Sequence, residues 1–126
     1  MSHHASMLNV AALATLEQAL NAALALDPKT GERLTRMEGK VIALELSGIG
    51  IKLYLQPADG GLRLMGHFDG QADTTLRGAP LSMLRMSSGR TGEGMFRGGV
   101  EIDGDVELAT RFQRVLEKLN VDLEEH

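Results

Sequence analysis

The sequence predicts an α+β domain in which a small, mainly antiparallel sheet of about five strands is covered by helices. Three observations predict this fold class. Apolar residues recur every three or four positions near both ends of the chain, they alternate with a period of two between positions 40 and 77, and neither a repeat nor a linker separates these regions. Because 126 residues suffice for one core, the elements should pack together as a single domain.

The first part of the chain predicts two helices. Leucines at positions 13, 16, 20 and 24 are interleaved with alanine, the residue with the highest helix propensity, and this pattern predicts a helix over residues 8–26. Asp27 and Pro28 should end it, because proline disfavours helical geometry in the residue before it. Proline also suits the first turn of a new helix, and a short second helix is expected over residues 32–37.

The middle of the chain predicts four strands. In the first three, every second residue is apolar, which places the apolar residues of each strand on one face. These residues are Ile42, Leu44 and Leu46, then Ile49, Ile51, Leu53 and Leu55, then Leu62, Leu64 and Phe68. A turn is expected over residues 57–61 between the second and third strands, and a shorter fourth strand fits residues 73–77.

The last part predicts a short apolar helix, a strand and a long helix. Pro80 should begin the short helix, whose apolar residues are Leu81, Met83, Leu84 and Met86. A glycine-rich stretch follows, and then a strand over residues 100–102. We expect Gly104 to form a turn and Asp105 to cap a helix over residues 106–120. One stripe of that helix is apolar, with Leu108, Phe112, Val115, Leu116 and Leu119, and the opposite face carries Arg111, Arg114 and Lys118.

Composition excludes several classes of protein. The chain has no cysteine, which rules out disulfides and a thiol nucleophile and agrees with a cytoplasmic location. A net charge of -4 argues against nucleic acid as a partner, because binding to phosphates needs a basic face. No apolar run is longer than that of residues 22–26, which is far shorter than the ~20 residues that span a bilayer, so no membrane-spanning segment is expected.

No catalytic centre, metal site or cofactor is expected. His67 is the one histidine away from the ends of the chain, and no strained G-x-S-x-G turn accompanies it, so we do not expect an enzyme. Asp103, Asp105 and Glu107 are spaced as at the start of a calcium loop, but Leu108 stands where that loop requires glycine. The glycine-rich stretch lacks the Gly-Lys-Ser/Thr of a nucleotide cradle. Three arginines lie in or beside the glycine-rich stretch: Arg85, Arg90 and Arg97. They could bind an anionic head group or a partner's carboxylates, or they could be solvated.

The predicted helices carry more apolar surface than one small sheet needs. A sheet with one buried face is covered by about two helices at native packing density, so a third apolar helix beside a glycine-rich segment could enclose a cavity. A plainly filled core is the alternative. If the cavity exists, we expect these residues to line it: Leu64, Phe68, Leu81, Leu84, Met86, Met95, Phe96, Phe112 and Leu116.

Two segments resemble a known family. Residues 99–109 and 78–84 resemble the C-terminal signature and the mid-chain helix entry of the sterol carrier protein type 2 family. The matching residues of the signature and its helix are Gly104, Asp105, Leu108, Ala109, Phe112 and Leu116. The starts of the first helix and first strand are similar to those of family members that assist bacterial ubiquinone biosynthesis. The resemblance implies a sterol-carrier-like fold with an apolar cavity, binding of a prenylated quinone precursor or phospholipid, and assembly with other ubiquinone biosynthesis proteins.

The expected organisation is one lipid-binding domain with short flanking segments. We interpret residues 1–6 as an expression scar, residues 7–120 as the domain, and residues 121–126 as the start of a truncated helical region. The leading hypothesis is a carrier without enzymatic activity. The main alternative is a scaffold or dimerisation module that carries no lipid. Its exposed apolar patches would contact other proteins, and it could form a homodimer.

Overall fold

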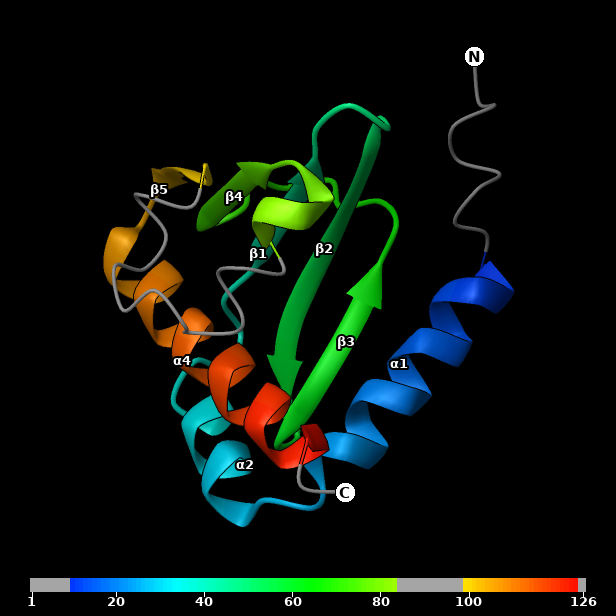
Figure 1. Cartoon of the computed structure of the whole chain (residues 1–126), viewed down its shortest axis with the longest axis vertical. Coiled ribbons are helices and arrows are strands. Elements are labelled where there is room, and N and C mark those ends of the chain that lie inside the picture. Colours follow the sequence, from blue (N-terminus) through cyan, green and yellow to red (C-terminus); the bar gives the residue numbers. More distant parts are fainter. Residues whose placement is uncertain (1–9, 84–98, 125–126) are drawn as a thin grey trace.

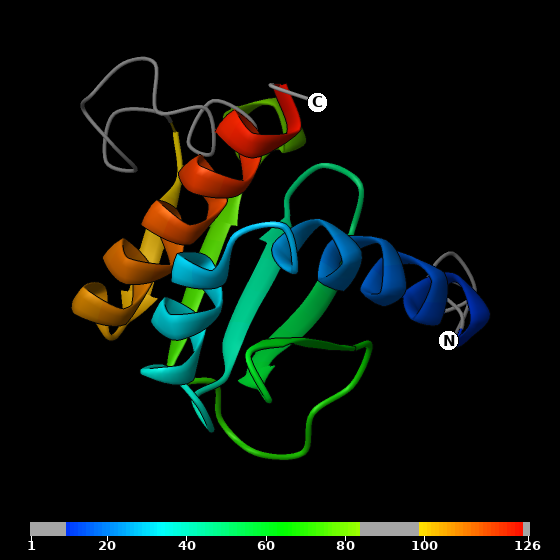
Figure 2. The ribbon, with the colours of Figure 1, turned by 90° about the horizontal axis from the view of Figure 1, so that it is seen from below.

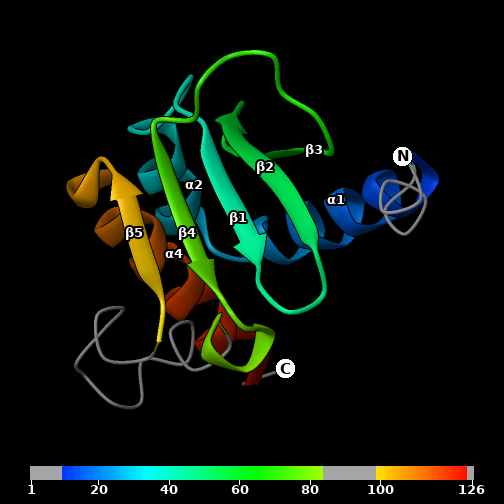
Figure 3. The ribbon, with the colours of Figure 1, turned by 90° about the horizontal axis from the view of Figure 1, so that it is seen from above.

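A five-stranded sheet with helices on one face forms the structure (Figure 1). The computed structural model describes residues 10–83 and 99–124. The strands are β1 (Ile42–Leu46), β2 (Ile51–Ala58), β3 (Gly61–Met65), β4 (Thr74–Gly78) and β5 (Glu101–Gly104). The helices are α1 (Val10–Leu24), α2 (Pro28–Thr35) and α4 (Val106–Glu124), and a further helix starts at residue 80. All three labelled helices lie on the same side of the sheet (Figure 2), and none of them covers the opposite face, which we call the bare face (Figure 3).

The sheet is mixed but mainly antiparallel, as predicted. Its order is β3-β2-β1-β4-β5, and β1 pairs with β4 in parallel while the other pairings are antiparallel. The parallel pair arises because the loop after β3 crosses back to the other side of β1 before β4 begins. Together with the helices on one face, this sheet confirms the predicted α+β class.

The turn between β2 and β3 lies later than the sequence predicts. Residues 57–61 were expected to form the turn, but Pro57 lies inside β2 and pairs with Leu62. Only Asp59 and Gly60 form the turn, both with positive φ (55° and 75°), as two-residue hairpins require. The sheet tolerates Pro57 because the pairing of β2 with β1 ends at Leu55. Proline lacks a backbone N–H, and at position 57 no residue of β1 stands opposite to accept a hydrogen bond from one.

Helix α1 binds the free edge of β3 through polar side chains. Asn21 Nδ2 donates to the carbonyl oxygen of Leu62 at 3.0 Å, and the N–H of Leu62 donates to Asn21 Oδ1 at 2.8 Å. One turn earlier, Glu17 Oε1 accepts the N–H of Leu64 at 2.8 Å. These bonds satisfy backbone groups that an edge strand would otherwise leave unpaired, and they fix α1 at the side of the apolar face.

Helix α2 begins four residues before its predicted start. Asp27 caps it by accepting the N–H of Lys29 at 3.0 Å and the hydroxyl of Thr30 at 2.9 Å, and Pro28 occupies the first turn. The interpretation of Asp27 and Pro28 as a stop and a new start is therefore confirmed. The predicted range of 32–37 was wrong because the helix continues through Gly31 and ends at Thr35.

The predicted cap of the last helix is confirmed. Asp105 Oδ1 accepts the N–H of Leu108 at 3.0 Å, and Gly104 makes the turn with φ of +107°. Helix α4 then buries the apolar stripe that its sequence predicts against α2, β4 and β5. Its most buried members are Leu108, Ala109, Phe112, Val115 and Leu119, and Leu116 is partly buried.

Candidate functional site

The candidate site is the apolar face of the sheet under the helices. Backbone alternation directs one row of side chains from three neighbouring strands toward this face. The row consists of Leu53, Leu55, Ile42, Leu44 and Leu76. Helices α1, α2 and α4 supply the opposing apolar residues, and together they form one core cluster.

Burial of this face decreases toward one end of the sheet. Where β1 begins, Ile42 and its partner Leu55 are 0% and 4% exposed. Where β1 ends, the register brings Leu46 beside Ile51 of β2 and Gly78 of β4, and there Leu46 and Ile51 are only partly buried. The apolar surface of the sheet therefore continues beyond the part that the described helices seal.

Further partly buried apolar residues pack against the core. They are Leu44 of β1, Met83 of the helix that starts at residue 80, and Leu116 of α4. These side chains come from the sheet and from two helices, and each leaves part of its apolar surface uncovered.

The predicted lining residues fall into three groups. Leu64 (8% exposed) and Phe112 (0%) belong to the core cluster, and Leu116 packs against it. Leu81 is 58% exposed at the start of the helix that follows β4. Phe68 lies on the opposite face of the sheet. The remaining predicted residues lie outside the described ones: Leu84, Met86, Met95 and Phe96.

Phe68 misses the apolar face because β3 is shorter than predicted. The strand ends at Met65, so the alternation that would place Phe68 beside Leu64 stops before it reaches Phe68. Its ring packs instead against Tyr54, with 5.8 Å between ring centroids. Tyr54 alternates with Leu53 and the other buried residues of β2, which puts it on the bare face.

The bare face carries a row of paired charges across four strands. Glu45 of β1 bonds Arg77 of β4 at 2.7 Å and Lys52 of β2 at 3.1 Å, and Arg77 reaches Glu101 of β5 at 3.4 Å. Each pair joins residues directly opposite in the register. The bond from Arg77, and then that from Lys52, lowers the pKa of the Glu45 carboxyl below its ordinary value. This face is built for contact with water.

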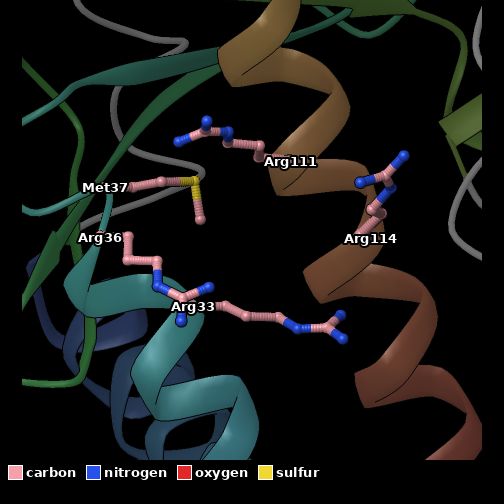
Figure 4. A pocket seen from close by; sticks show the side chains of 5 residues that line it. All are labelled: Arg33, Arg36, Met37, Arg111 and Arg114. Carbon is pink, nitrogen blue, oxygen red and sulfur yellow. The ribbon is translucent and has the colours of Figure 1, made fainter.

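A pocket between α2 and α4 was not predicted from the sequence. It measures about 310 Å³ and is lined by Arg33, Arg36, Met37, Arg111 and Arg114 (Figure 4). Two segments carry the same pattern, in which arginine, arginine and lysine stand at positions i, i+3 and i+7: residues 33, 36 and 40, and residues 111, 114 and 118. In α4 this spacing places three cations on one side of the helix, whereas α2 ends at Thr35 with Arg36 as its C-cap. The repeated pattern could have pointed to a basic site.

The described residues give no support for catalysis or metal binding. His67 lies in the loop after β3 and contacts Asp69 at 2.7 Å, and both side chains are more than four-fifths exposed. Within residues 10–83 and 99–124, no group of three or more histidine, aspartate or glutamate side chains could hold a metal ion. Over the same residues, no helix has the length and apolar character needed to cross a membrane.

Comparison with family models identifies the family. The model of the SCP-2 sterol transfer family matches residues 20–117, most of the chain. The chain belongs to this family. The match includes the end of α1, all five strands and the capped part of α4. A search of curated proteins gives no match.

Solved structures share the fold. The UbiJ-SCP2 ubiquinone synthesis protein superposes with a TM-score of 0.73 at 23% identity, over 85% of this chain and 94% of that one. Sterol carrier protein 2 from Yarrowia lipolytica gives 0.55 at 17% identity, over 93% and 96%. The sec-alkylsulfatase Pisa1 from Pseudomonas sp. gives 0.59 at 18% identity, over 81% of this chain but 16% of the enzyme. The fold thus occurs both alone and as a small part of a larger enzyme.

Proposed function

We propose that this chain is a lipid-binding accessory domain of ubiquinone biosynthesis without catalytic activity of its own. It holds a prenylated quinone precursor or a phospholipid chain in an apolar cavity at the less buried end of the helix-covered face. Its partners are the lipid and other ubiquinone biosynthesis proteins. The family and the fold shared with a ubiquinone synthesis protein support this role.

One observation carries the proposal. The apolar face of the sheet extends past its sealed part, where Leu44 and Ile51 pack against the core yet keep exposed surface, and Leu116 on α4 is likewise only partly buried. Hiding apolar area from water contributes about 25 cal/mol per Å², so a hydrocarbon chain that covers these residues gains free energy. Without a bound guest, the same apolar area would stay in contact with water, which costs free energy.

The proposed lining follows from the predicted residues. Phe112 and Leu116 form its inner wall, and Leu81 stands at its rim. Leu64 pairs with Leu55 beside Ile42, so it lies deeper, at the sealed end of the face. The other predicted lining residues lie outside the described ones: Leu84, Met86, Met95 and Phe96. Phe68 packs on the bare face with Tyr54, and we leave it out of the lining.

Mass spectrometry of lipids extracted from the purified protein tests whether a cargo is present. The proposal expects a prenylated quinone precursor or phospholipid in stoichiometric amount. A protein free of lipid that also fails to bind a prenylated quinone on titration would refute it. If such a protein instead formed a stable homodimer on sizing columns, the scaffold alternative would replace the carrier.

A tryptophan probe locates the cargo. The chain has no tryptophan, so Leu116→Trp introduces a single reporter at a partly buried residue that packs against the core. A bound quinone should quench its fluorescence saturably. The matched control is Leu26→Trp, at a residue 56% exposed just after α1, which should show no saturable quenching. Equal quenching of both variants would contradict the proposed site.

A further inference from the structure

We propose that the pocket between α2 and α4 binds a phosphate-type oxyanion. The anion is carried either by a lipid head group at a bilayer surface or by a free phosphate compound. The charged side chains of the site do not belong to the apolar face, and the site does not depend on a lipid cargo.

The pocket concentrates guanidinium groups from two helices. Arg33 and Arg36 come from the last turn and the C-cap of α2, and Arg111 and Arg114 come from the middle of α4. Figure 4 shows the side chains of Arg33, Arg36 and Arg111 reaching into the space between the helices, with that of Arg114 beside α4 at the rim. Met37, 2% exposed, forms an apolar wall.

The basic groove extends beyond this pocket in both directions. Toward one side, a pocket of about 340 Å³ is lined by Arg33, Arg114, Glu117 and Lys118. Toward the other, a smaller one of about 70 Å³ includes Arg36, Lys40 and Arg111. Six of the 13 lysines and arginines of the chain therefore line one groove, although the whole chain has a net charge of -4.

The carboxylates near the groove are already engaged. Glu107 pairs with Arg111 at 3.0 Å, Glu117 accepts a hydrogen bond from Gln113 at 3.1 Å, and Asp105 caps α4. Within the described part of the chain, no hydrogen bond or ion pair holds the guanidinium groups of the other three pocket arginines, which are Arg33, Arg36 and Arg114. No ion pair among the described residues neutralises these three cations, so a bound anion would lower their mutual repulsion.

Phosphate matches this arrangement better than other anions do. A guanidinium donates two parallel hydrogen bonds to neighbouring phosphate oxygens, and several guanidiniums can share the oxygens of one group. A pocket of about 310 Å³ has room for a phosphate or diphosphate with part of its substituent. The apolar wall at Met37 suits an ester group attached to that phosphate.

Two binding experiments on the purified chain distinguish the sources. The first titrates the protein with inorganic pyrophosphate by calorimetry. The second measures cosedimentation with vesicles of phosphatidylcholine, with and without phosphatidylglycerol. Binding to the mixed vesicles alone assigns the site to lipid head groups, and binding of pyrophosphate alone assigns it to a free phosphate compound. Binding to neither overturns the proposal.

Variants identify the residues responsible. Arg33→Gln together with Arg36→Gln should weaken binding by at least about tenfold, because each lost charge-assisted contact costs about that factor. Arg36→Lys keeps the charge but loses the paired donors and should weaken binding less. The control is Arg63→Gln on β3, an exposed arginine away from the groove, which should bind as the unmodified protein does. Equal affinity of the Arg33/Arg36 variant and this control would overturn the proposal.

The stability of the variants separates binding from structural support. Without an anion, removing charge from the groove relieves repulsion, so Arg36→Gln should unfold at the same or a higher urea concentration than the unmodified protein. With pyrophosphate, only the unmodified protein should gain stability. A clear loss of stability in Arg36→Gln without the anion would assign Arg36 a structural role and contradict the proposed site.

Discussion

The polar contact between α1 and β3 offers a sharp test of how the apolar face is closed at one side. The side-chain amide of Asn21 makes two hydrogen bonds to the backbone of Leu62, at 2.8 and 3.0 Å, in a partly buried position. Asn21→Ala removes both and leaves an N–H and a carbonyl of the edge strand unpaired. At about 1 kcal/mol net for each bond, the free energy of unfolding should fall by about 2 kcal/mol.

Urea unfolding followed by circular dichroism measures this loss. With a slope of about 2 kcal/mol per molar urea, the midpoint should fall by about 1 M. The matched control is Gln18→Ala, an exposed residue of α1, which should leave the midpoint unchanged. Hydrogen exchange should also show that the Leu62 amide loses protection in Asn21→Ala alone. Equal midpoints and equal Leu62 protection in the two variants would refute the role given to Asn21.

Three further predictions concern single side chains in the sheet. Thr74→Val should raise the free energy of unfolding by about 1 kcal/mol, because the fully buried Thr74 hydroxyl has no hydrogen-bond partner, and an unchanged urea midpoint would contradict this. Gly104→Ala should lower the free energy of unfolding by at least about 2 kcal/mol, because φ of Gly104 is +107° and a Cβ there would lie 2.6 Å from the carbonyl oxygen of Asp73. A loss below about 0.5 kcal/mol would contradict this strain. Arg77 lowers the pKa of Glu45 in the folded state, so the stability that this carboxylate contributes is present at neutral pH and is lost as the pH falls through that lowered value. The free energy of unfolding should therefore decline on acidification, and less steeply in Glu45→Gln than in the unmodified protein. Parallel pH profiles of the two proteins would show that Glu45 does not contribute to the pH dependence of stability.

Local patterns in the sequence predicted the features that depend on neighbouring residues. The period of two located β1 and β2, because alternate side chains must face the core. The caps at Asp27 and Asp105 were predicted correctly, since a short polar side chain before a helix bonds its first free N–H groups. The apolar stripe of α4 was predicted because a helix that covers a sheet needs one.

Features that depend on distant residues could not be predicted in this way. Pro57 fits inside β2 only because β1 stops pairing at Leu55, which no local pattern reveals. Phe68 reaches Tyr54 because β3 ends early and the chain then turns over the bare face.

The arginine pocket is a third such feature. It brings together residues of α2 and α4 that lie more than seventy positions apart, and only the packing of one helix against the other creates it. The repeated spacing of the cations indicates two basic segments, but not that the two segments meet.

Methyl NMR during titration with a prenylated quinone tests the central claim most directly. The account predicts saturable shifts of the Leu44, Ile51 and Leu116 methyl signals, which lie where the apolar face is incompletely sealed, and little change at the sealed Leu34. Unchanged signals at all of these residues, or shifts confined to exposed side chains such as Leu26, would mean that no cargo enters between the sheet and the helices.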